Sequence, residues 1–561
     1  MAGARAAPQM RNKGKFAIPK LNGTRHRLFL AATAALVMRA TACAPLSSAA
    51  TPEVPIKATD FEAAIARLEP HGPQSPEALN ARLQYADFLS EPAADDCQQR
   101  LAAAQSQLDI VAASPAANVL LPLAPALIAN GEYKIHLAHA SCGNQPPLKT
   151  ELEQALAAAQ RAVGLYRDAL DYQSAAIMQF NVAATDYALA DVPAAIPALQ
   201  AAIAMDREFG FREDAEDNTR SLLRWRGSGA GDGDVAALMK DFSARTAEFK
   251  FNWSSGDADV AISAADASVI DGKIVRSQGT GTLNHHVSAS PTGWTVSNEP
   301  GNSTYEMGDW PTDAKKDLEW SAMYFLASAL LLAPTIEIGR DGNFNSVADA
   351  QSFGTSLAAK ASVQLSGIPS ETADATLKAA FSPDFIESSA MQNYGIETGT
   401  WIGAKLEQGV WYQMSTPLFL SALGLGHYLV NHDISFAFTR QVPCTADAPD
   451  HLCAEIVVHA TPDTDDLNMA VQMVDRQLGL PDQQTPDPNT VVKVVGGQLR
   501  FAASQTLHYW SMTDLRLVID PDTLRPYVCD TRQHWYAAFD GLGQGDSVIE
   551  SVRTVSTSVY H

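Results

Sequence analysis

A run of eight residues, 227–234, divides the sequence into two parts with different periodicities. It reads GSGAGDGD, so every second position is glycine and no apolar side chain is larger than that of alanine. This composition is typical of a linker or a long turn. Before the run, apolar residues recur every three or four positions, which predicts helices; after it, polar and apolar residues alternate, which predicts strands. We therefore expect two domains, residues 58–226 and 235–561.

The first domain is rich in alanine and has a helical period. Leu152, Leu156, Ala159, Val163 and Tyr166 follow one another at steps of three or four, which places an apolar stripe along one helix face. Short connections between such segments favour antiparallel neighbours. The pattern predicts helices at residues 58–69, 76–90, 94–113, 122–141, 147–168, 172–190, 193–208 and 212–225.

One segment of this domain resembles a known repeat. Ala183, Ala195, Leu199 and Ala202 have the spacing at which tetratricopeptide repeats place small and apolar residues, and Asp191 marks the turn between two helices. The resemblance implies a tetratricopeptide-like array that binds a protein or peptide on its concave face. In the alternative interpretation, the helices only pack on the second domain.

The second domain has several hairpin signals. Asp271 and Gly272 separate two strand-like runs, which is the strongest short-range signal of a hairpin. The same arrangement recurs at Asp341 and Gly342 and at residues 520–522. Hairpins in succession favour antiparallel pairing. Further strands are expected at residues 281–288, 293–297, 410–414, 427–439, 454–460, 491–495, 498–503 and 548–559.

Helices are expected to interrupt these strands. They are predicted at residues 235–248, 312–332, 348–364, 371–381 and 464–478. The fold class is therefore α+β, with an N-terminal antiparallel helical repeat domain followed by an antiparallel-sheet domain with interspersed helices.

Residues 322–332 are apolar on every side. A helix of this kind is buried in a core or lines a hydrophobic cavity, and core helices are the commoner case. A curved antiparallel sheet closed by an apolar helix resembles in shape the half-barrels of exported lipid carriers. The resemblance implies an apolar ligand in the second domain.

Residues 1–42 have the features of a secretory signal peptide. Basic residues come first, an apolar run follows at residues 28–38, and small residues precede Cys43. The run is shorter than the roughly 20 residues that a membrane span needs. The small residues and Cys43 resemble the lipobox of bacterial lipoproteins, which implies lipidation of Cys43 and a tether, residues 43–57, to the outer membrane. The same residues also suit an ordinary signal peptidase, which attaches no lipid.

The net charge limits the possible binding partners, and the cysteines bear on the cellular compartment. Residues 1–42 carry eight basic and no acidic side chains, so their removal takes the formal charge from -23 to -31. Such acidity disfavours nucleic acid and anionic membrane surfaces. An oxidising compartment favours disulfides. We expect one between Cys97 and Cys142 and one between Cys444 and Cys453, with Cys529 left as a buried thiol.

Local catalytic and metal motifs do not support an enzyme. The sequence contains neither G-x-S-x-G nor H-E-x-x-H. His136, His139 and Cys142 could share a helix face as metal ligands, but the expected disulfide removes Cys142 from the set. Cys529 and His534 are five residues apart in one strand, so they face opposite sides and could meet as nucleophile and base only through a bend. We predict no catalytic residue, metal or cofactor.

These features predict a non-catalytic binding or scaffold lipoprotein of the cell envelope, located in the periplasm. The helical repeats are expected to bind a protein or peptide, and the second domain an apolar ligand. One alternative is an envelope enzyme whose site is assembled from distant residues. Another is a structural assembly factor without a small ligand.

Overall fold

The computed structural model describes most of the chain beyond residue 56. The described residues are 57–69, 72–91, 96–142, 148–227, 231–242, 245–270, 272–307, 333–364, 382–419, 429–463, 466–467, 494–495, 498–499, 507–539 and 548–561. Several predicted features lie outside these ranges: the expected signal peptide, Cys43, the helices expected at 312–332 and 371–381, and most of the one expected at 464–478. No helix within the described ranges is long and apolar enough to span a membrane.

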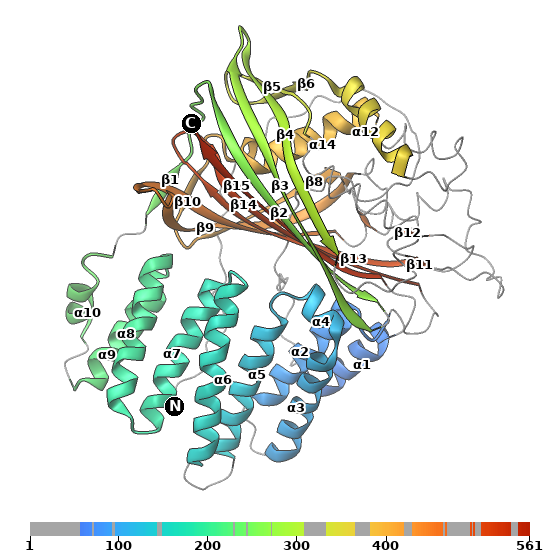
Figure 1. Cartoon of the computed structure of the whole chain (residues 1–561). Helices are drawn as coiled ribbons and strands as arrows, with labels where there is room; N and C mark the ends of the chain where they lie inside the picture. The colour runs from blue at the N-terminus through green and yellow to red at the C-terminus, as the bar shows by residue number, and fades with distance from the viewer. Residues whose placement is uncertain are drawn as a thin grey trace, which may run out of the picture.

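The predicted α+β fold is confirmed: a helical region comes first and an antiparallel sheet domain follows (Figure 1). Neighbouring helices of the first region lie side by side in an array beneath the sheet. Its helices are α1 (Ala58–Leu68), α2 (Pro76–Ser90), α3 (Cys97–Ala113), α4 (Pro115–Leu120), α5 (Ala124–Ser141), α6 (Lys149–Asp168), α7 (Tyr172–Ala188), α8 (Val192–Phe209), α9 (Arg212–Trp225) and α10 (Asp232–Leu238).

Local side chains determine where several of these helices begin. Ser75, Ser114, Asp171 and Asp191 each accept a hydrogen bond from the backbone N–H three residues later, which satisfies one donor of the first turn. Proline follows at the first helical position of α2 and α4, where its missing N–H costs nothing. Between α5, α6 and α7 the buried residues are mostly alanine, so these helices pack closely.

Two parts of the helical region differ from the prediction. Residues 115–120 lie between the helices predicted at 94–113 and 122–141, and they form the helix α4. Residues 235–248 were expected to form one helix, but α10 ends at Leu238 and β1 (Thr246–Glu248) pairs with β7 (Lys405–Glu407). In β1 only Ala247 is buried, and pairing across the domain outweighs helix propensity there.

The main sheet has eleven described strands, and every neighbouring pair is antiparallel. Their order across the sheet is β6-β5-β4-β3-β2-β15-β14-β13-β10-β9-β8. The C-terminal strand β15 therefore lies in the middle, beside β2. The strands are β2 (Gly256–Ile270), β3 (Lys273–Ala289), β4 (Gly293–Met307), β5 (Ile336–Gly339), β6 (Phe344–Val347), β8 (Trp411–Phe419), β9 (Leu429–Thr445), β10 (Ala448–Pro462), β13 (Leu507–Ile519), β14 (Pro526–Phe539) and β15 (Val548–Tyr560).

The three predicted hairpins join β2 to β3, β5 to β6 and β13 to β14. Gly272 and Gly342 adopt φ values of +73° and +85°, which residues with a Cβ rarely adopt. In the third turn, Asp520 accepts hydrogen bonds from Asp522 N at 2.9 Å and from Thr523 Oγ1 at 2.7 Å. The strand expected at 281–288 is the second half of β3.

The sheet lies between two helical layers. The array covers one face, and α12 (Ala350–Gln364) and α14 (Pro383–Glu397) lie on the other (Figure 1). α14 was not expected from the sequence. Two further described strands, β11 (Val494–Val495) and β12 (Gln498–Leu499), pair only with each other.

Candidate functional site

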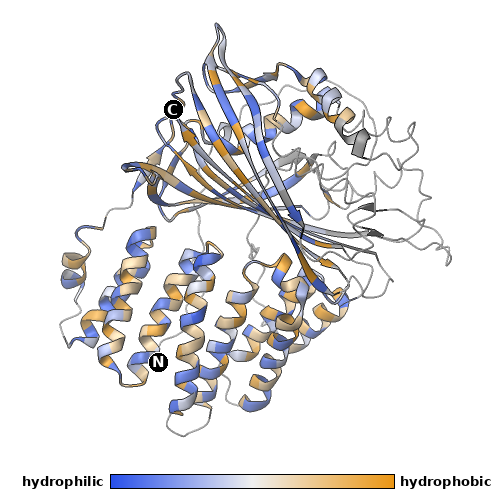
Figure 2. Cartoon of the chain, in the orientation of Figure 1, coloured by the Kyte–Doolittle hydropathy of each residue, from blue (hydrophilic) through white to orange (hydrophobic). Residues whose placement is uncertain are grey.

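The two faces of the sheet differ in chemistry because side chains alternate along each strand. Toward α14, Ile456 of β10 and its partner Leu517 of β13 are buried in an apolar core. Toward the helical array, the neighbouring positions are Glu455 and Arg516. Figure 2 shows this mixture of hydrophobic and hydrophilic residues along the long strands. The array therefore covers a face that carries charges.

Glu455 is fully buried where α7 meets this face. Its carboxylate accepts hydrogen bonds from Arg516 Nε at 2.7 Å, Arg440 Nε at 3.1 Å, Thr439 Oγ1 at 2.9 Å and Tyr172 Oη at 3.2 Å. Burial raises the pKa of Glu455, but the two arginines outweigh burial and hold the pKa below its ordinary value. The carboxylate is therefore ionised and joins one helix to three strands.

Aromatic side chains add to the contact that Glu455, Tyr172 and Arg440 make between α7 and the sheet, and we call this contact the Glu455 joint. The rings of Tyr172 and Phe209 stack with their centroids 4.1 Å apart and pack on Val457 of the sheet. The Arg440 guanidinium lies 5.4 and 5.3 Å from the two ring centroids, close enough for cation–π attraction. Arg440 Nη1 also lies 2.7 Å from Glu208 at the end of α8. The joint thus combines apolar contact with charge pairing.

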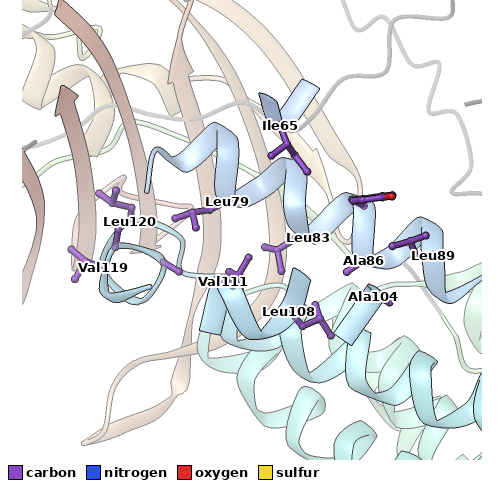
Figure 3. Packing of buried hydrophobic residues seen from close by; sticks show 14 of the residues in the cluster. Ile65, Leu79, Leu83, Ala86, Leu89, Ala104, Leu108, Val111, Val119 and Leu120 are labelled. Carbon is purple, nitrogen blue, oxygen red and sulfur yellow. The ribbon is translucent and has the colours of Figure 1, made fainter. Parts of the chain in front are cut away.

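The helix α4 makes a second contact with the sheet. Val119 and Leu120 are buried in a cluster that includes Tyr536 of β14 and Ile549 of β15. Figure 3 shows Val119 and Leu120 beside the leucines of α2 and α3. His534 Nδ1 lies 2.8 Å from the Val119 carbonyl, and burial lowers the pKa of this histidine. The neutral imidazole therefore carries its hydrogen on Nδ1, and this N–H donates a hydrogen bond to the Val119 carbonyl.

A cavity of about 640 Å³ lies beside this contact, and we call it the interlayer cavity. One wall comes from α4, the start of α5 and the end of α6, and the other from β2, β3, β4, β14 and β15. Its volume is in the range of small-molecule sites, about 300–1,000 Å³. Six charged residues line it: Arg276, Arg532, Arg553, Asp168, Asp266 and Glu306.

A smaller cavity of about 160 Å³ lies on the opposite face, between the sheet and α14. We call it the α14 cavity. Its polar lining includes His285, Asn298 and Arg525. Its apolar lining includes Val260, Leu283, Val287, Val296 and Ile336.

The structure joins both cysteine pairs that the sequence predicts. Cys97 at the start of α3 is bonded to Cys142 at the end of α5, with 6.1 Å between the Cα atoms. Cys444 and Cys453 bridge the β9–β10 hairpin, with 5.0 Å between theirs. Cys529 is buried and outside any disulfide. It lines the α14 cavity, whereas His534 lines the interlayer cavity, so the two face opposite sides as predicted.

Two of the three residues considered as metal ligands have other partners. His136 Nδ1 lies 2.9 Å from Glu151 Oε2, and Cys142 is consumed by its disulfide. His285 lines the α14 cavity, while the adjacent His286 is paired with Asp257 on the other face. In the part of the chain that the structure describes, no group of three or more potential ligands could hold a metal ion.

No protein-family model matches the chain, and no curated protein matches it either.

Sequence reasoning did not identify Glu455, Arg532 or Arg553. A signal was present in β14, where Asp530, Arg532 and His534 alternate with less polar residues. In a sheet with one solvated face, such alternation describes the exposed side. Only the position of the helical array shows that this face is covered.

Proposed function

We propose that the protein is an exported, non-catalytic binding protein that holds an apolar ligand in the α14 cavity. The observation that carries this proposal is the cavity itself. Apolar side chains of β2, β3 and β4 form one wall, and polar groups that include His285, Arg525 and Glu397 line part of the rest, as in many ligand sites. A volume of about 160 Å³ matches an engineered apolar cavity of about 150 Å³ that binds benzene. We infer that one short apolar group, such as the end of an acyl chain, occupies it.

The test compares two identical substitutions on neighbouring strands. Val260 lines the cavity, whereas Val559 of β15 is 46% exposed. Val260→Phe fills the cavity, so we expect it to weaken binding of a fluorescent fatty-acid analogue at least tenfold. Val559→Phe should bind the analogue as the unchanged protein does. Equal binding by both variants, or no binding by the unchanged protein, would refute the proposed ligand.

The compartment and the anchor belong to the same proposal. Two disulfides suit an oxidising compartment such as the periplasm. The tether through a lipidated Cys43 is proposed from the sequence alone. Mass analysis of the mature N-terminus tests it, since an unmodified first residue is incompatible with an anchor at Cys43.

A protein or peptide partner for the helical repeats stays a prediction. The side of the array that carries Val119, Tyr172 and Phe209 packs on the sheet, which is the arrangement considered as the alternative. The apolar ligand is therefore the better supported part of the proposal.

A further inference from the structure

Two arginines lie directly opposite each other beside the interlayer cavity. Arg532 of β14 and Arg553 of β15 are cross-strand partners, and both line the cavity. Like charges in this position destabilise a sheet unless anions lie close to both. On its other side Arg532 lies opposite Asp514 of β13, whose carboxylate lies 2.8 Å from His459 Nδ1, so the two carboxylates beside the arginine pair are Asp514 and Asp530.

Asp530 forms hydrogen bonds with Arg553 but not with Arg532. Its carboxylate accepts from Arg553 Nε at 2.9 Å and from Arg553 Nη2 at 2.7 Å, a bidentate pair. Arg532 Nε is 3.9 Å from Asp530 Oδ1, beyond hydrogen-bond distance. Arg532 Nη1 lies 3.5 Å from the carbonyl of Asp168, and its buried Nε makes no hydrogen bond with the described residues. Most donors of the Arg532 guanidinium are thus left for another acceptor.

A third arginine faces the same space across two small residues. Arg276 of β3 is exposed, lines the cavity and forms no ion pair with any residue that the structure describes. Ala265 and Ala267 of β2 lie between β3 and β15 on this face. Arg276 lies opposite Ala267 and Arg553 lies opposite Ala265. With strands about 4.8 Å apart and a rise of about 3.4 Å per residue, the backbones of the two arginines are about 12 Å apart across the alanines. A small molecule can lie on the alanines and reach the guanidinium groups.

The acidic residues of the lining are engaged elsewhere or lie at its margin. Asp266 accepts from Ser277 Oγ at 3.2 Å, and Glu306 accepts from Gln278 Nε2 at 3.4 Å. Asp168 is exposed at the end of α6. None of the three forms an ion pair with Arg532 among the described residues, and the carboxylates beside Arg532 are those of Asp530 and Asp514 in the sheet.

A buried acceptor in the same lining also has no partner. His534 is only 4% exposed, and its Nδ1 donates to the Val119 carbonyl. Its Nε2 makes no hydrogen bond with the described part of the chain. A ligand that carries a hydroxyl group beside its anionic group would supply the missing donor.

We propose that the interlayer cavity binds a small organic anion through a phosphate or carboxylate group held by Arg532 and Arg276. Planar guanidinium groups suit both kinds of oxyanion. Since a bare phosphate would occupy only a small part of about 640 Å³, the ligand has an uncharged portion that lies on the alanine floor. This site is on the opposite face of the sheet from the α14 cavity, so it stands independently of the apolar ligand.

The experiment measures binding of three probes to the full mature chain with its disulfides intact. Glucose 6-phosphate, glucuronate and inorganic phosphate are titrated in a calorimeter at low ionic strength. We expect saturable binding of glucose 6-phosphate or glucuronate. Binding of the former but not the latter assigns a phosphate ligand, and the reverse assigns a carboxylate. Saturation by neither probe at millimolar concentration would overturn the proposal, and so would phosphate that binds as tightly as both.

Arginine variants inside and outside the cavity distinguish binding at this site from nonspecific attraction of anions to the protein. Arg532→Gln should weaken binding by about 10-fold to 100-fold, since hydrogen bonds to charged groups are worth about 1.5–3 kcal/mol. Arg276→Gln should weaken it less. Arg224→Gln, an exposed position on α9, is the control and should leave binding unchanged.

The unfolding temperature of the Arg532→Gln variant shows whether a loss of binding reflects a loss of folded protein. The Arg532→Gln variant loses the repulsion from Arg553 together with the attraction to Asp514 and Asp530, so we expect the ligand-free variant to unfold at about the same temperature as the unchanged protein. Equal affinities of the Arg532→Gln and Arg224→Gln variants would refute the site. Loss of binding together with a lowered unfolding temperature would also count against it, because Arg532 would then be structural.

Discussion

Glu455 remains ionised although no solvent reaches it, because Arg440 and Arg516 both donate to its carboxylate. Taking three charges out of water is unfavourable, and the hydrogen bonds from Thr439 and Tyr172 offset part of that penalty. The group therefore contributes little as an isolated ion pair. It ensures instead that α7 meets β9, β10 and β13 in one arrangement.

Replacing Glu455 with glutamine is expected to lower the free energy of unfolding by about 3–5 kcal/mol, because two guanidinium groups would stay partly buried without a counter-charge. Chemical denaturation measures the change. Glu208→Gln is the matched control, since Glu208 pairs with the same Arg440 but is 46% exposed; it should cost less than about 1 kcal/mol. Similar losses for both variants would show that burial of Glu455 is unimportant.

At the scale of the element, local signals predict the long helices and the hairpins well. The bounds of α2 and α9 agree with the periodicity because serine, proline and charged residues mark their ends. α4 has only six residues, too few to show a period. Its position depends on Tyr536 and Ile549, which are more than 400 residues away in the chain. Such a helix exists because the sheet buries it.

The disulfides also act at this scale, by closing loops of different length. Cys97 and Cys142 are 45 residues apart, and Cys444 and Cys453 only 9. If the bridges act through the entropy of the unfolded chain, removing the first should cost about 4 kcal/mol and the second about 2.5 kcal/mol. Paired Cys→Ser variants, compared by denaturation, measure both. A greater loss for the hairpin bridge would contradict the entropic account.

At the scale of the molecule, the sheet joins the ends of its domain. β15 pairs with β2, so the last residues of the chain lie beside the first long strand after the helical region. The array then meets the sheet at the Glu455 joint and at α4, with the interlayer cavity beside α4. The two regions divided by residues 227–234 are therefore in contact across the polar face.

Because the helical array and the sheet are in contact, we expect that destabilising one also destabilises the other. Phe209 is 1% exposed and packs on Tyr172 and Val457, so Phe209→Ala should cost about 3–5 kcal/mol. Hydrogen exchange should show reduced protection in α7 and α8 and also in β9 and β10. Tyr187→Ala, at an exposed position on α7, is the control. Faster exchange confined to the helices would mean that the regions unfold independently.

The sequence by itself determined what local chemistry controls: the order of the long helices, the three hairpins, the two cysteine pairs, and the opposite orientation of Cys529 and His534. Caps, turns and periodicity involve residues close together in the chain, so they can be recognised from the sequence without the tertiary structure. Only the tertiary structure decided that β15 lies beside β2 and that helices cover the charged face. Alternation separates two faces of a strand, but what packs on each face depends on distant segments. For that reason Arg532 is an ordinary strand arginine in the sequence and a binding candidate in the folded protein.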